Sequence, residues 1–135
     1  MISGLILFAH GARDPRWAEP LVRLHERVAQ CAPEIAVETA FLEIMTPDLA
    51  TAAARLVEKG CQSITIVPVF LGQGGHVRHD LAALMQTLRA THPAIELRSA
   101  PAVGEDTGVI DALASYCLRM LETETDSGAD SGATP

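Results

Sequence analysis

The sequence has 135 residues, 48% of them hydrophobic, and a formal net charge of −7. This length is typical of one domain with its own hydrophobic core. The ten basic residues are scattered, without a run of Lys or Arg, which argues against a nucleic-acid-binding surface. No apolar run approaches the roughly twenty residues that span a membrane.

The cysteines indicate a reducing compartment. Cys31, Cys61 and Cys117 are odd in number and widely spaced, without a C-x-x-C motif. This pattern argues against a disulfide framework or a structural zinc site. The first apolar run, residues 5–9, has no basic residue before it and does not resemble a signal peptide. We therefore expect a cytoplasmic protein.

Predicted strands and helices alternate along the chain. Continuous apolar runs indicate buried strands, expected over residues 4–9, 35–42, 63–71 and 95–100. Apolar residues at helical spacing, bounded by Pro or Gly, predict helices. These are expected between Pro15 and Pro33, between Pro47 and Gly60, between Gly75 and Pro93, and over residues 106–122.

Two details refine this assignment. Pro68 falls inside the third strand, and because proline cannot donate to a sheet ladder we expect it near the carboxyl end of that strand. In the last helix, the spacing of the apolar residues predicts one inward-facing stripe. Its members are Val109, Leu113, Tyr116, Cys117 and Met120.

The order βαβαβαβα is typical of an α/β fold with a parallel sheet and helices on both faces. Right-handed crossovers favour the strand order 2-1-3-4, as in a four-stranded flavodoxin-like half. We expect this domain to span residues 1–122. Residues 123–135 are rich in small and polar residues and contain three acids but no base. They are expected to form a disordered acidic tail.

Ligands of such sheets bind beyond the carboxyl ends of the strands, where the strand order reverses. That point lies between strands one and three, which are followed by His10 and by the loop 72–75 that leads to His76. Adjacent strands lie about 4.8 Å apart, so we expect both imidazoles to face one crevice, with Glu43 at its rim. Two imidazoles and a carboxylate can bind a first-row divalent ion such as Co, Fe, Ni or Zn.

Three segments together resemble the CbiX/SirB family of class II tetrapyrrole chelatases. They are FAHGARDP at 8–15, AFLE at 40–43 before Pro47, and VPVFLGQGGH at 67–76 with Asp80 after it. The resemblance covers roughly residues 4–121. One departure is Ala12, where many relatives have Ser after the His-Gly pair.

This resemblance implies a flavodoxin-like chelatase half that inserts Co²⁺ or Fe²⁺ into sirohydrochlorin, in cobalamin or sirohaem biosynthesis. Co²⁺ is favoured and Ni²⁺ is a third candidate, with neither ATP nor an organic cofactor. The short form of the family implies a homodimer. His10, His76 and Glu43 would be the metal-binding and catalytic residues. One imidazole would present the metal while the other, with Glu43, accepts the inner N–H protons.

Sirohydrochlorin carries carboxylates at its edge, and several residues are candidates to bind them. Arg13 either receives one of them or pairs with Asp14. Backbone N–H groups of the glycine-rich loop, including Gly74 and Gly75, are further donors at a helix start. Asp80, one turn after the second histidine, either orients that ring or supports the helix.

Two other functions remain open at this stage. A histidine directly followed by glycine after the first strand, together with the glycine-rich loop, is also found in phosphoryl-transfer enzymes of the histidine-phosphatase type. No Arg precedes His10, however, and no P-loop motif is present. A non-catalytic carrier of the metal or the tetrapyrrole would use the same histidines and would differ only in turnover.

Overall fold

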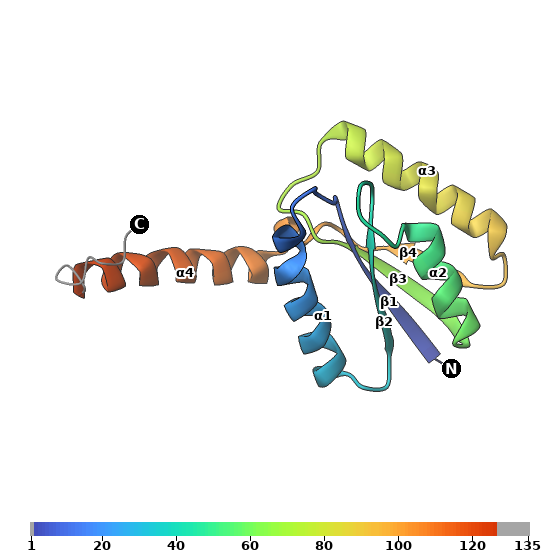
Figure 1. Cartoon of the computed structure of the whole chain (residues 1–135), viewed down its shortest axis with the longest axis horizontal. Helices are drawn as coiled ribbons and strands as arrows, with labels where there is room; N and C mark the ends of the chain where they lie inside the picture. Colours follow the sequence, from blue (N-terminus) through green and yellow to red (C-terminus); the bar gives the residue numbers. More distant parts are fainter. Residues whose placement is uncertain (1, 127–135) are drawn as a thin grey trace.

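The structure is a computed structural model, and it describes residues 2–126, with the side chains of residues 2–122. Four parallel strands form one sheet in the order β2-β1-β3-β4, as predicted (Figure 1). The strands are β1 (Ile2–Ala9), β2 (Ala36–Phe41), β3 (Cys61–Pro68) and β4 (Glu96–Ser99). Pro68 is the last residue of β3 and lies beyond Ile66, the last residue of β3 that pairs with β4, so its missing N–H removes no bond to that strand.

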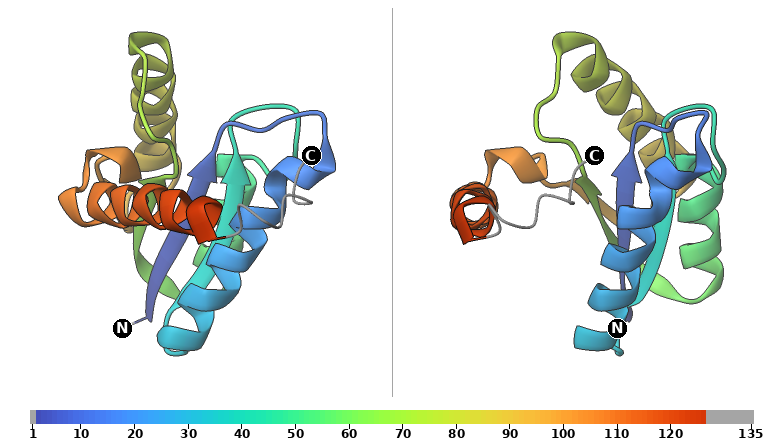
Figure 2. Two further views of the ribbon diagram at one scale, coloured as in Figure 1. Left: turned by 90° about the vertical axis from the view of Figure 1, so that its left-hand side faces the viewer. Right: turned by 60° about the vertical axis from the view of Figure 1, so that its left-hand side comes forward.

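The helices lie on both sides of this sheet. They are α1 (Glu19–Cys31), α2 (Leu49–Glu58), α3 (Gly75–Thr91) and α4 (Thr107–Asp126), with short 3-10 turns η1 (Pro15–Ala18) and η2 (Val103–Glu105). Figures 1 and 2 show α2 and α3 over one face and α1 over the other. α4 leaves the domain on the α1 side.

The carboxyl half of β1 is the most deeply buried stretch of the sheet. Ile6, Leu7, Phe8 and Ala9 are at most 3% exposed, because β1 has a strand on each side and side chains packed on both faces. Ile6 and Phe8 belong to the cluster formed with α2 and α3. Ala9 belongs to a smaller cluster with Leu21 of α1.

The last helix departs from the prediction. α4 extends away from the sheet as a lone helix (Figure 1), and the only described element that it contacts extensively is η2. Leu113, Tyr116 and Met120 were expected inside but are 40–52% exposed. Cys117 is exposed as well, and Val109 is half-buried. Helical spacing identified an apolar stripe correctly, but it carries no information about what covers that stripe.

The last helix is also one turn longer than expected, since it was predicted to end at residue 122. α4 continues to Asp126, so residues 123–126, expected at the start of the tail, complete the helix. The rest of the predicted tail, residues 127–135, lies outside the described part of the chain. No described helix combines the length and apolar character that crossing a membrane requires.

Candidate functional site

The carboxyl ends of β1 and β2 place His10 beside Glu43. His10 directly follows Ala9, the last residue of β1, and Glu43 comes two residues after the end of β2. The Nε2 atom of His10 lies 3.0 Å from Oε2 of Glu43, and the two side chains are 45% and 56% exposed. A hydrogen bond of this kind fixes the orientation of an imidazole.

Backbone contacts between the two loops hold this pair together. The N–H of Leu42 donates to Ala9 O at 2.9 Å, and the N–H of Glu43 donates to His10 O at 3.1 Å. Gly11, which follows, has φ +104°, and a Cβ there would lie 1.9 Å from Glu43 O. Only glycine fits this position, because both the backbone angle and the available space exclude a side chain.

The second histidine lies in the first turn of α3. Its Nε2 atom is 3.3 Å from Oδ2 of Asp80, one turn later, and the side chain of His76 is 87% exposed. This is the contact expected of a carboxylate that orients the ring. The N-cap residue of α3 is Gly74, so no side chain caps the helix.

The two histidine–carboxylate pairs do not merge into one cluster. Among the described residues, no group of three His, Cys, Asp or Glu side chains can hold a metal ion. His10, Glu43 and His76, expected to share one ion, are therefore not assembled within one copy as it stands. The cause is the connection after β3, which carries the start of α3 beyond the sheet edge (Figures 1 and 2).

The glycine-rich loop is open. A Cβ at Gly72, Gly74 or Gly75 would meet no atom within 4 Å, and none of these residues has a positive φ. Neither packing nor backbone strain therefore requires glycine here, whereas close approach of a ligand to the backbone would.

Arg13 does not pair with Asp14. The carboxylate of Asp14 accepts hydrogen bonds from the side chain and the N–H of Arg16, at 2.8 Å and 2.9 Å. These bonds hold the pKa of Asp14 below its usual value. Arg13 is exposed and makes no ion pair with a described residue, so its guanidinium is available to a ligand.

Two exposed apolar residues at this edge were not singled out from the sequence. Ile44, next to Glu43, is 59% exposed, and Leu71, before the glycine-rich loop, is 68% exposed. Ile44 also has φ +70°, a conformation that a β-branched residue rarely adopts. For Ile44 the sequence signal was its place just after the expected second strand; Leu71 was expected as the last residue of the third strand, which ends at Pro68 instead.

Comparison with known proteins identifies the family. The chain matches the CbiX family over residues 4–119. It is a member of the CbiX family. Sirohydrochlorin cobaltochelatase from Sulfolobus acidocaldarius is 30% identical over 124 residues, which cover 92% of this chain and 97% of that relative. Sirohydrochlorin ferrochelatase from Priestia megaterium is 27% identical over 130 residues, and this CbiX chain spans 48% of its length.

Solved structures agree with this assignment. A CbiX protein of cobalamin biosynthesis from Marinobacter aquaeolei VT8 is 30% identical, with a TM-score of 0.80 over 90% of this chain and 98% of that chain. The sirohydrochlorin chelatase SirB from Bacillus subtilis subspecies spizizenii, in complex with cobalt, is 23% identical. It has a TM-score of 0.74 over 83% of this chain and 48% of its own, which supports the fold. The predicted family and fold are thus confirmed.

Proposed function

We propose that this CbiX-family chain inserts a divalent metal ion into sirohydrochlorin without ATP, with Co²⁺ as the favoured ion and Fe²⁺ next. One observation carries the proposal: an exposed His10–Glu43 pair stands at the carboxyl edge of the sheet. The chain around it is similar to a sirohydrochlorin cobaltochelatase along nearly the whole of that relative. Cobalt is favoured because the relative that this chain matches along 97% of its length is a cobaltochelatase.

The pairing of the side chains suggests a division of labour. The two inner N–H protons of the macrocycle must leave as the metal enters. His10 is suited to accept a proton at Nδ1, because its Nε2–H donates to the Glu43 carboxylate 3.0 Å away, and this carboxylate balances the charge of the imidazolium that forms. His76, oriented by Asp80, is suited to present the ion. One imidazole with few other ligands releases a metal more easily than a closed four-ligand site.

The macrocycle is a wide apolar disc with carboxylates at its edge. Ile44 and Leu71 offer exposed apolar side chains at the sheet edge for its face. Arg13, and the N–H groups of the loop that includes Gly74 and Gly75, would bind its carboxylates. The pathway, cobalamin or sirohaem, follows from the ion used in the cell.

The proposal includes a homodimer in the cytoplasm. One copy offers one wall for a disc-shaped substrate, and its two histidine pairs stand apart. α4 exposes an apolar stripe, and of the described helices only α1 packs on its face of the sheet. If α4 of a second copy lay on the uncovered part of this face, it would bury both its own apolar stripe and the exposed part of the sheet. In a two-fold symmetric dimer each copy would cover the other in this way.

The dimer is tested by its mass in solution. Leu113→Glu places a charge in the apolar stripe of α4 and is expected to yield monomers at concentrations where the native chain is dimeric. Ser115→Glu, two residues further and therefore on another side of the helix, is the matched control. Equal masses for both variants and the native chain would contradict the role of α4.

The function is tested by anaerobic turnover. Sirohydrochlorin is mixed with Co²⁺ or Fe²⁺ and the absorbance change is followed for the native chain and for His10→Ala, Glu43→Gln and His76→Ala. Each variant is expected to lose at least about tenfold in rate, as general acid–base catalysis contributes 10²–10⁴-fold. His92→Ala, at the opposite end of α3, is the control. One equivalent of product per chain would identify a carrier instead.

A further inference from the structure

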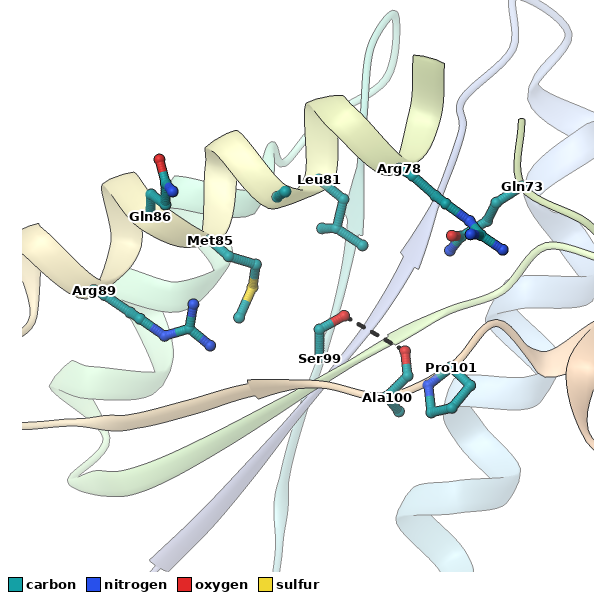
Figure 3. Close-up of a pocket in the computed structure, with 10 residues that line it drawn as sticks. Gln73, Arg78, Leu81, Met85, Gln86, Arg89, Ser99, Ala100 and Pro101 are labelled. Atoms are coloured by element: carbon teal, nitrogen blue, oxygen red, sulfur yellow. Dashed lines mark hydrogen bonds between the residues drawn. The ribbon is translucent and has the colours of Figure 1, made fainter. Parts of the chain in front are cut away.

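A groove runs between α3 and the end of β4. Its volume is about 370 Å³, and the buried side chains of Leu81 and Met85 form part of its lining. Ser99 and Ala100, at the carboxyl end of β4, line the opposite wall (Figure 3). The groove therefore opens at the same edge of the sheet as the site described above.

The charged residues that line this groove are both basic. Arg78 and Arg89 both line it, and of the described residues that line it none is acidic. The chain as a whole has a net charge of −7, so two cations without an acid stand out against their surroundings. Eleven residues make about three helical turns, which puts both arginines on one side of α3, about 16 Å apart along its axis.

The two arginines differ in what they bind. Arg89 donates from Nη2 to the carbonyl oxygen of Leu97 at 3.1 Å and is thereby tied to β4. Arg78 is exposed, makes no hydrogen bond or ion pair with a described residue, and points toward Gln73 in the glycine-rich loop (Figure 3). A guanidinium and an amide side chain that line the same groove, without an acid among the lining residues, are suited to bind a carboxylate.

A tetrapyrrole bound at the carboxyl edge of the sheet is wide enough to extend from the end of β1 to this groove. Strands β1, β3 and β4 are neighbours, so the ends of β1 and β4 are about 10 Å apart. Successive residues of a helix differ by 100°, so His76 and Arg78 lie on different sides of the first turn of α3. Both residues belong to the first turn, so a disc-shaped ligand placed over the N-terminal end of α3, rather than against one side of the helix, would reach His76 and Arg78 together.

We propose that Arg78, together with Gln73, binds a peripheral carboxylate of the tetrapyrrole and thereby selects substrates with carboxylates at this edge. This inference rests on the proposed function and adds a specificity-determining residue to it. Arg78 takes no part in proton transfer or metal binding. It acts on the affinity for the macrocycle alone.

The test measures binding of the metal-free tetrapyrrole by absorbance titration, and turnover in parallel. Arg78→Ala is expected to raise the dissociation constant and KM for sirohydrochlorin about tenfold, the loss of one charge-assisted hydrogen bond, with kcat and KM for Co²⁺ unchanged. Arg78→Lys retains the charge but loses the bidentate fork, and is expected to be intermediate. The salt dependence of binding should also be weaker in Arg78→Ala.

Arg89→Ala is the matched control, because it removes the same charge from the same side of α3. It is expected to bind the tetrapyrrole like the native chain. Equal weakening by Arg78→Ala and Arg89→Ala, or no weakening by either, would overturn the inference. Binding without turnover by the native chain would refute the enzymatic function and still test Arg78, so the two failures are distinguishable.

Discussion

Replacement of Gly11 by alanine tests how the His10–Glu43 pair is held. Gly11 has φ +104°, and a Cβ there would lie 1.9 Å from the carbonyl oxygen of Glu43, against 3.4–4 Å for ordinary contact. The loop that carries Glu43 must therefore move by more than about 1 Å. That movement would break the hydrogen bond from Glu43 N to His10 O.

The expected loss can be estimated from its two parts. An alanine at positive φ costs about 1–2 kcal/mol, and one lost backbone hydrogen bond about 0.5–1.5 kcal/mol. We expect Gly11→Ala to lower the free energy of unfolding by about 2–3 kcal/mol. Gly60→Ala measures the cost of a positive φ alone, because Gly60 has φ +93° but the nearest atom to its Cβ would be 3.6 Å away.

Urea unfolding of the two variants provides the measurement. Gly74→Ala, with open space and an ordinary φ, is expected to unfold at the native midpoint. Gly11→Ala should also lose more turnover than Gly60→Ala, because only the former displaces Glu43. If Gly11→Ala and Gly60→Ala are equally stable and equally active, the contact between the two loops does not position the pair, and the reasoning fails.

Further predictions concern capping, thiols and assembly. Asp48 caps α2 by accepting from the N–H of Thr51 at 2.8 Å, and hydrogen bonds from Thr51 lower the pKa of Asp48. Asp48→Ala is expected to cost about 1 kcal/mol at neutral pH. Because the folded pKa is lowered, this stabilisation is complete above about pH 4 and disappears as the pH falls through the folded pKa. Asp48→Asn should keep most of the capping stabilisation at both pH 7 and pH 3, which denaturation curves at these two pH values measure. If the native chain is as much more stable than Asp48→Ala at pH 3 as at pH 7, the prediction is wrong. Burial raises the pKa of the Cys61 thiol, whereas Cys31 and Cys117 are exposed. Maleimide labelling read by mass spectrometry should modify Cys31 quickly and Cys61 only on unfolding; rapid labelling of Cys61 in the native chain would speak against the buried site. If α4 is exchanged in a dimer, Cys117 should label faster on dilution, and a rate independent of concentration would argue against that exchange.

Most of the fold was predictable from local patterns. Continuous apolar runs marked the strands, with β1 buried on both faces, and Pro and Gly marked most helix ends. Parallel strands with right-handed crossovers leave few arrangements, so the strand order followed as well. Because the carboxyl ends of these strands meet at one edge, His10 and Glu43 were expected near each other. In the structure, Nε2 of His10 lies 3.0 Å from Oε2 of Glu43.

The tertiary structure decided what local patterns do not contain. The apolar spacing of α4 was read correctly, yet its stripe faces outward, because periodicity reports which residues are apolar and not which surface covers them. Likewise, His76 pairs with Asp80 and not with Glu43, since the path of the loop after β3, rather than the spacing of strands, sets where α3 begins. The sequence by itself determined the order of the elements and the sheet edge at which His10 and Glu43 lie. Only the packing of loops and helices in space decided which side chains meet there.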